Sequence, residues 1–214
     1  MIASEFEEVQ GISYVIGAVD GSHIPIIAPK IDPASYYCRK GFYSALLQGV
    51  VNSKCLFWDY DFGWAVSNHD WSVFQRTEIG KKFLRGKFKP YKLIGDATYP
   101  MRPCFILPFK GSKSRLSIEK QYWNFIQSST RMAVERAFGI LKGRWRILLK
   151  RIDIPLHHVP DVVTACICLH NLCLSHTDGF DMRWAKQAEE ELERTRRGVF
   201  GKLHSIGMFH IAET

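Results

Sequence analysis

Three acidic residues lie where the sequence could place carboxylates for catalysis. Asp20 follows the apolar segment 14–19, and Asp96 follows a second short buried segment, 91–95. Both segments are typical of strands covered on both faces, and reactive groups in open α/β sheets gather at the carboxyl ends of strands. If the two strands are parallel neighbours, the carboxylates repel each other unless a proton or a cation intervenes. Oxygen ligands of this kind favour Mg²⁺ or Mn²⁺, although an Asp after a strand is also a common turn residue.

Glu135 is the third acid, and it lies on a predicted helix. The apolar residues of this helix are spaced by four, three, four and three positions, which predicts a stripe facing the core: Val134, Phe138, Leu141, Trp145 and Leu148. Glu135 lies beside that stripe, at the edge of the buried face. The simpler interpretation is an exposed ion pair with Arg131 one turn earlier, which would stabilise the helix little.

The charge is concentrated in one block of the chain. Residues 81–151 hold 18 Lys or Arg and 3 Asp or Glu, a net charge of +15, whereas the whole chain carries +8. Such a block predicts a polyanionic partner, and nucleic acid is favoured over a membrane because no amphipathic anchor accompanies it. A solvated basic surface is the alternative. The predicted phosphate-binding residues are Arg131, Lys142, Arg144, Arg146, Lys150 and Arg151.

Other chemically capable residues have ordinary structural explanations. Asp70 could lie near a metal, but capping of the following helix explains it as well, so it is left out of the predicted metal set. Cys166, His170 and Cys173 share one helical face, as zinc ligands would, but no fourth ligand is evident and the helix is apolar. Trp145 could stack on a base, although its place in the apolar stripe favours core packing.

The elements that must position the acids form an α/β pattern. The chain has 214 residues, 46% of them hydrophobic, which suits one domain with a core, and no apolar run reaches the ~20 residues of a membrane helix. Strands are predicted at 14–20, 22–28, 44–51, 55–60 and 91–96, and helices at about 70–85, 130–150, 160–176 and 182–197. Strands precede most helices, so a regular βα alternation is excluded and a mixed sheet is expected.

Six segments in this order resemble one known family, the PIF/Harbinger transposases and the nucleases derived from Harbinger transposases. The resemblance covers about residues 14–176, and several motifs in series make it specific. The motifs are GAVDGSHI (17–24), YCRKGFY (37–43), SNHD (67–70), IGDATYP (94–100), VERAFGILKGRWR (134–146) and LHNLC (169–173).

The resemblance implies an RNase H-like fold: a mixed five-stranded sheet flanked by helices, with C-terminal helices. It also implies an Asp-Asp-Glu catalytic triad, in which Asp20, Asp96 and Glu135 match the family motifs in order. The implied activity is cleavage of DNA with Mg²⁺ or Mn²⁺ held by these three carboxylates. The implied partners are DNA and a Myb/SANT-like DNA-binding protein, in the nucleus or the cytoplasm. The alternative is a domesticated, non-catalytic DNA-binding or scaffold protein of the same fold.

The predicted organisation has three parts. Residues 1–13 are an incoming segment, 14–178 the nuclease domain, and 179–214 a peripheral charged helical tail. Relatives of this kind usually carry an upstream helix-turn-helix-like region, so a truncated chain is expected. The first ten residues lack the basic and apolar pattern of a secretory signal, and the irregular cysteine spacing favours reduced thiols in a cytosolic or nuclear protein.

Overall fold

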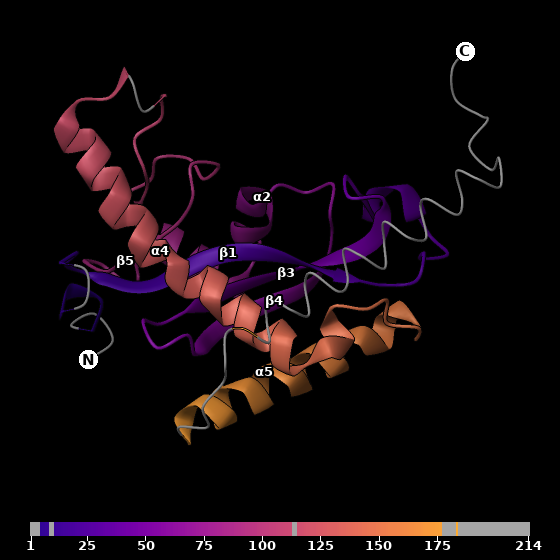
Figure 1. Cartoon of the computed structure of the whole chain (residues 1–214). Helices are drawn as coiled ribbons and strands as arrows, with labels where there is room; N and C mark the ends of the chain where they lie inside the picture. The colour runs from indigo at the N-terminus through magenta and orange to yellow at the C-terminus, as the bar shows by residue number, and fades with distance from the viewer. Residues whose placement is uncertain (1–4, 9–10, 113–114, 177–182, 184–214) are drawn as a thin grey trace, which may run out of the picture.

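A computed structural model describes residues 5–8, 11–112, 115–176 and 183 (Figure 1). The predicted charged helix at 182–197 lies outside the described residues, apart from Arg183. The strands are β1 Val15–Pro25, β2 Tyr37–Cys38, β3 Phe42–Val51, β4 Phe57–Ala65, β5 Lys92–Ile94 and β6 Phe105–Ile106. The helices are α2 Asp70–Phe74, α3 Glu78–Leu84, α4 Ile118–Arg144 and α5 Val159–Ser175, with 3-10 turns at Pro33–Tyr36, Arg146–Leu148 and Leu156–His158.

The strands form one mixed sheet with β1 in its centre. β1 pairs antiparallel with β3 and parallel with β5; β6 extends the sheet parallel to β5, and β4 pairs antiparallel with β3. This confirms the predicted α/β class and the mixed sheet of an RNase H-like fold. The sheet has six strands rather than the predicted five, because two of the predicted strands are one and the two-residue strands β2 and β6 are too short to carry a recognisable pattern.

The central strand is longer than predicted. The expected strands at 14–20 and 22–28 are one continuous strand, because Gly21 and the residues after it keep pairing with β3 up to Pro25. Pro25 is the last residue of β1, where a missing N–H costs the ladder little.

Two clusters of apolar side chains cover the two faces of the sheet. The larger cluster joins β1, β3 and β4 to α4 and α5, and includes Val134, Leu141 and Ile167. The smaller cluster joins β5 and β6 to α2 and α3 through Phe74 and Phe83. Figure 1 shows α4 crossing β1, with α5 beside its second half. The sheet is therefore buried on both faces, which explains why its central strands are apolar on both sides.

The helices differ from the prediction mainly at their boundaries. The helix expected at 70–85 is two helices, because Thr77 caps the second one by accepting from the N–H of Gly80. The helix expected at 130–150 begins at Ile118, where Ser117 is the N-cap, and ends at Arg144. The helix expected at 160–176 is confirmed as α5.

Two further observations concern the ends of the molecule and its surface. Phe6 and Ile12, from the predicted incoming segment, are buried in the larger core cluster, so the described part of this segment packs on the domain. Among the described residues, no helix is both long and apolar enough to cross a membrane.

Candidate active site

The register of the sheet places Asp20 and Asp96 at equivalent positions on neighbouring strands. Ala18 of β1 pairs with Ile94, the last residue of β5, and each Asp stands two residues further along. Asp20 was expected at the end of its strand, but it lies within β1, near the point where β5 stops. The two carboxylates therefore occupy the sheet edge at which the carboxyl end of a parallel strand opens.

Glu135 is connected to Asp20 through one guanidinium group. Arg131 Nη1 lies 3.0 Å from Asp20 Oδ2, and Arg131 Nη2 contacts Glu135 Oε1. The side chains of Arg131 and Asp20 are only 18% and 23% exposed, whereas that of Glu135 is 48% exposed. The ion pair expected between Arg131 and Glu135 thus exists, but it is not a simple surface pair because it extends to a strand acid 111 residues away.

Two polar contacts hold α4 in the position that makes this possible. The buried Gln127 donates from Nε2 to the carbonyl of Gly95, 2.6 Å away, directly before Asp96. Near the other end, Lys142 Nζ donates to the carbonyl of His23 at 2.8 Å. The turn that carries Arg131 and Glu135 lies between these anchors, so its direction over β1 is fixed.

The surroundings of Asp20 favour its neutral form. The pKa of Asp20 is raised from 3.8 to about 6, mainly by burial; the charges of Asp70 and Asp96 contribute to this rise, while the Gly21 N–H and Arg131 oppose it. The Gly21 N–H donates to Oδ1 at 2.8 Å. Added positive charge at this position would therefore stabilise the carboxylate form.

Asp96 is held by the turn that follows it. Thr98 donates to Asp96 Oδ1 from its backbone N–H at 2.9 Å and from its hydroxyl at 2.5 Å. Tyr99 is 1% exposed, and burial raises its pKa well above the ordinary value, with further contributions from Asp70, Asp20 and Asp96. Tyr99 is therefore a neutral phenol at physiological pH.

Asp70 lies near these acids, which is the alternative that the sequence left open beside helix capping. The N-cap of α2 is His69, without a side-chain cap bond, and Asp70 is the first helical residue, so the capping explanation is wrong. Burial raises the pKa of Asp70, and the charge of Asp96 raises it further. The SNHD motif is a sequence signal for Asp70. The close approach of α2 to β1, which places Asp70 beside the other acids, leaves no such signal.

The donors suit a hard divalent cation in type, since they are carboxylate oxygens with several negative charges in a small volume. Within the described part of the chain, no group of three or more His, Cys, Asp or Glu side chains is arranged so that it could hold an ion. The guanidinium of Arg131 supplies the positive charge between Asp20 and Glu135 in this arrangement. The residue types thus suit a divalent cation, whereas in this structure Arg131 lies between Asp20 and Glu135.

A comparison with known protein families covers the segments that carry Asp20, Asp96 and Glu135. The family model described as DDE superfamily endonuclease matches residues 19–171. The chain belongs to the DDE endonuclease superfamily. This match spans every motif on which the resemblance to Harbinger-derived nucleases rests except the first two residues of the first motif and the last two of the last.

Individual curated relatives point to the same family. The chain is 28% identical to "Protein ALP1-like" of Arabidopsis thaliana over 194 residues, 83% of this chain and 47% of that protein. It is 28% identical to "Putative nuclease HARBI1" of Bos taurus and 26% identical to its Homo sapiens counterpart, each over 97% of this chain and 58% of the relative. The chain thus spans about half the length of the curated relatives it matches. No solved structure matches it.

The six predicted phosphate-binding residues differ in their contacts and exposure. Arg131 and Lys142 contact Asp20 and the His23 carbonyl, as described above, while Arg151 pairs with Asp153 at 2.6 Å. Arg144 is half-buried beside the core, and Arg146 and Lys150 are exposed after the end of α4. Arg146, Lys150 and Arg151 are therefore the exposed members of the predicted set.

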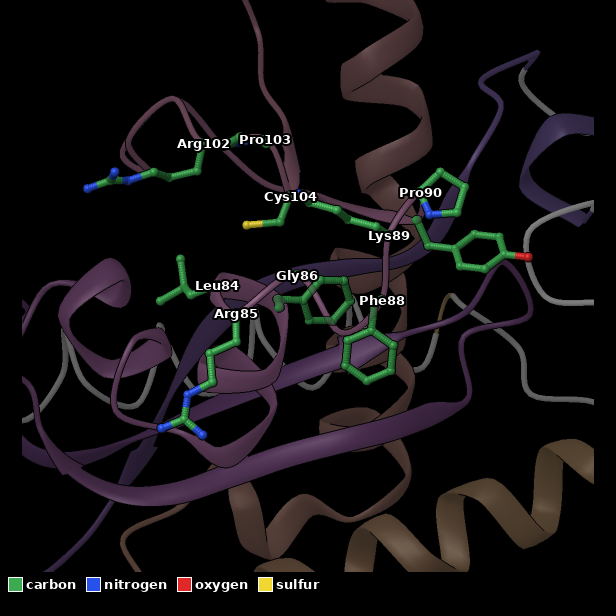
Figure 2. Close-up of a pocket in the computed structure, with 11 residues that line it drawn as sticks. Leu84, Arg85, Gly86, Phe88, Lys89, Pro90, Arg102, Pro103 and Cys104 are labelled. Atoms are coloured by element: carbon green, nitrogen blue, oxygen red, sulfur yellow. The ribbon is translucent and has the colours of Figure 1, made fainter.

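A pocket of about 250 Å³ lies at the opposite end of β5 from Asp96. Tyr91, which precedes β5, lines it together with Arg85 and Lys89, and the 102–104 segment closes its other side. Figure 2 shows Arg85 and Arg102 extending from two sides of this pocket. It belongs to the basic block, but the length of β5 separates it from the carboxylates.

The residues considered for zinc have other contacts. His170 is fully buried, and its Nε2 lies 2.9 Å from the Cys55 carbonyl. Its ring also packs against Phe57 at 5.2 Å. His170 therefore links α5 to the turn before β4 as a core residue. Trp145 packs against the core cluster, as its stripe position predicts.

Proposed function

We propose that this chain is a divalent-metal-dependent DNA endonuclease of transposase origin that cleaves phosphodiester bonds through Asp20, Asp96 and Glu135. The observation that carries the proposal is the equivalent register of Asp20 and Asp96 on parallel neighbours, with Glu135 linked to Asp20 through Arg131. Membership of the DDE endonuclease superfamily supports it.

The three carboxylates would hold Mg²⁺ or Mn²⁺ as oxygen ligands. Bound there, divalent cations would supply Lewis acidity for an attacking water or 3′-hydroxyl and for the leaving oxygen of the phosphodiester. The protein contributes fixed orientation: Thr98 restrains Asp96, the Gly21 N–H restrains Asp20, and the two anchors of α4 restrain Glu135.

DNA would be held mainly by charge. The proposed phosphate-binding set is Arg131, Lys142, Arg144, Arg146, Lys150 and Arg151, within a block of net charge +15. Phosphate contacts of this kind orient a duplex without reading its sequence. Sequence recognition would then come from elsewhere, and we include in the proposal a Myb/SANT-like DNA-binding partner and a nuclear location.

The contact of Arg131 with Asp20 and Glu135 favours a second candidate, a non-catalytic DNA-binding or scaffold protein. In that function the guanidinium would be the permanent counter-charge of the acids, and no metal would be needed. The two functions differ in whether divalent metal can displace Arg131 from the carboxylates.

Incubation of the full chain with supercoiled plasmid separates these functions. We expect nicked or linear DNA in Mn²⁺ or Mg²⁺ and none in excess chelator. DNA binding that persists without cleavage under every metal condition would reject the endonuclease and favour the scaffold. Cleavage that persists in chelator would reject the metal mechanism.

A further inference from the structure

The start of α2 is pressed against the strand that carries Asp20. A Cβ atom built on Gly21 would lie 2.4 Å from Asp70 Oδ1, closer than real contacts allow. Any side chain at position 21 would therefore push the Asp70 carboxylate away from β1. The glycine that follows Asp20 thus leaves the space that the Asp70 carboxylate occupies, one residue further along the strand.

A buried amide holds Asp70 in this position. Gln48, 2% exposed, pairs with Gly21 across the β1–β3 ladder. Its Nε2 donates to the backbone carbonyl of Asp70 at 2.9 Å and lies 3.4 Å from the hydroxyl of Tyr99. This side chain of β3 thus connects α2, which carries Asp70, with the turn after Asp96, and its own residue lies opposite Gly21, next to Asp20, in the ladder.

Among the described residues, only the charge of the adjacent His69 opposes the rise in the pKa of this carboxyl group. Arg131 serves Asp20 and Glu135, and among the described residues no hydrogen bond or ion pair reaches the Asp70 side chain. A partly buried carboxylate without a partner is unfavourable for folding. Groups kept at such a cost are typical of sites that bind a ligand of opposite charge.

We propose that Asp70 is a further carboxylate ligand of the divalent metal, beside Asp20 and Asp96, and that the absence of a side chain at Gly21 admits it. This inference rests on the proposed metal-dependent function and extends it to a fourth acid. It also gives Gln48 the role of a positioning residue, since its contacts hold the backbone of Asp70.

Titration of the metal-free full chain with Mn²⁺ by calorimetry tests this without measuring cleavage. We expect Asp70→Asn to weaken Mn²⁺ binding by about 10-fold or more, and the matched control Asp61→Asn, on β4, to leave it unchanged. Gly21→Ala should also weaken binding, because it displaces the Asp70 carboxylate without removing a ligand. In the double variant the two losses should not add, since they remove the same interaction.

The outcomes separate the two proposals. If the wild type binds Mn²⁺ and both Asp70→Asn and Gly21→Ala bind it equally well, Asp70 is not a ligand, while the proposed function stands. If the wild type binds no Mn²⁺, the metal-dependent function fails and the assignment of Asp70 fails with it. Should Asp70→Asn not fold, as judged by its melting curve, Gly21→Ala decides the question alone.

Discussion

Two groups of acids, on the sheet or next to it, each include a carboxyl group with a raised pKa. They differ in the elements that bring their members together. Asp20, Asp70 and Asp96 come from three elements and approach one another because of the β1–β5 register and the Gln48 contact. Asp59 and Asp61 are two residues apart on one strand, β4.

Burial raises the pKa of Asp59 to about 6, with Asp61 adding to the shift, so this value equals that of Asp20. No arginine bridges Asp59 to an acid of another element among the described residues, whereas Arg131 does so for Asp20. The comparison teaches that a raised pKa does not by itself identify a catalytic acid. Convergence of acids from distant segments is the more informative property.

The largest expected difference between the two groups is in DNA cleavage. Asp96→Asn keeps the size of the side chain but removes a charged oxygen ligand. We expect cleavage in Mn²⁺ to fall by at least about 100-fold, the upper end of the loss for residues that only support a ligand. Asp61→Asn should retain wild-type cleavage in the same plasmid assay. Equal activity of the two variants would end the distinction between the groups.

Stability should respond in the same direction at both groups. Asp20 has a folded pKa of about 6 against 3.8 when unfolded, so its charge destabilises the fold above pH 6 and stops doing so below about pH 4. Asp20→Asn should therefore stabilise the chain at pH 8 by up to about 3 kcal/mol, with the gain disappearing towards pH 4.

Asp59→Asn should give a gain of the same sign but smaller, because Asp59 is more exposed to solvent. Urea unfolding at several pH values measures both. A gain that grows on acidification would show that the sign of the Asp20 shift is wrong.

The basic block, residues 81–151, should contribute more to the salt dependence of DNA binding than residues 1–80, which hold 5 Lys or Arg and 9 Asp or Glu. Arg146 and Lys150 are exposed, and replacing both with Ala should lower the magnitude of the slope of log K against log salt by up to about 2. The matched control replaces Lys30 and Lys54, outside the block, and should leave the slope unchanged. Fluorescence anisotropy on two unrelated duplexes measures it.

An unchanged slope in a well-folded Arg146/Lys150 variant would remove this surface from the path of the DNA. The sequence offers one rival explanation, packing of this region on the acidic segment 189–193, which lies outside the described residues. In that case the melting temperature would change and the slope would not.

The smallest effect concerns the bridge that only the first group possesses. Arg131→Ala should cost about 1 kcal/mol of stability in chelator, as expected for a partly exposed ion pair. It should also increase the rise in melting temperature caused by Mn²⁺, because the competing cation is gone. A decrease in that rise would mean that Arg131 assists metal binding rather than opposing it.

The sequence predicts those parts of this molecule that depend on local pattern. The apolar runs before Asp20 and Asp96 predict buried strands, and the stripe through Val134 and Leu141 predicts the buried face of α4. These succeed because burial on both faces, or on one stripe, leaves a direct trace in the residue types.

Other features arise from contacts between distant residues and leave no local trace. An acid before a helix normally caps it, so the sequence alone explains Asp70 as a cap, and only the Gln48 contact and the space at Gly21 place it near Asp20. The early start of α4 was missed because Ile118, Tyr122 and Phe125 are exposed and form no buried stripe there. Arg131 was predicted to bind DNA, and its approach to Asp20 depends on how α4 crosses β1.

The placement of Asp20 within the long central strand has a consequence for dynamics. Asp20 pairs with Gly49 of β3, and the pairing of β1 with β5 ends two residues earlier, at Ala18. The amide hydrogens of this central segment should therefore exchange with solvent only when the whole domain opens. Asp96 instead follows a three-residue strand and begins a turn, where local opening suffices. The segment around Asp20 should therefore be rigid, and the segment around Asp96 should open locally. Occupation by a ligand should slow exchange at 96–99 far more than at Asp20.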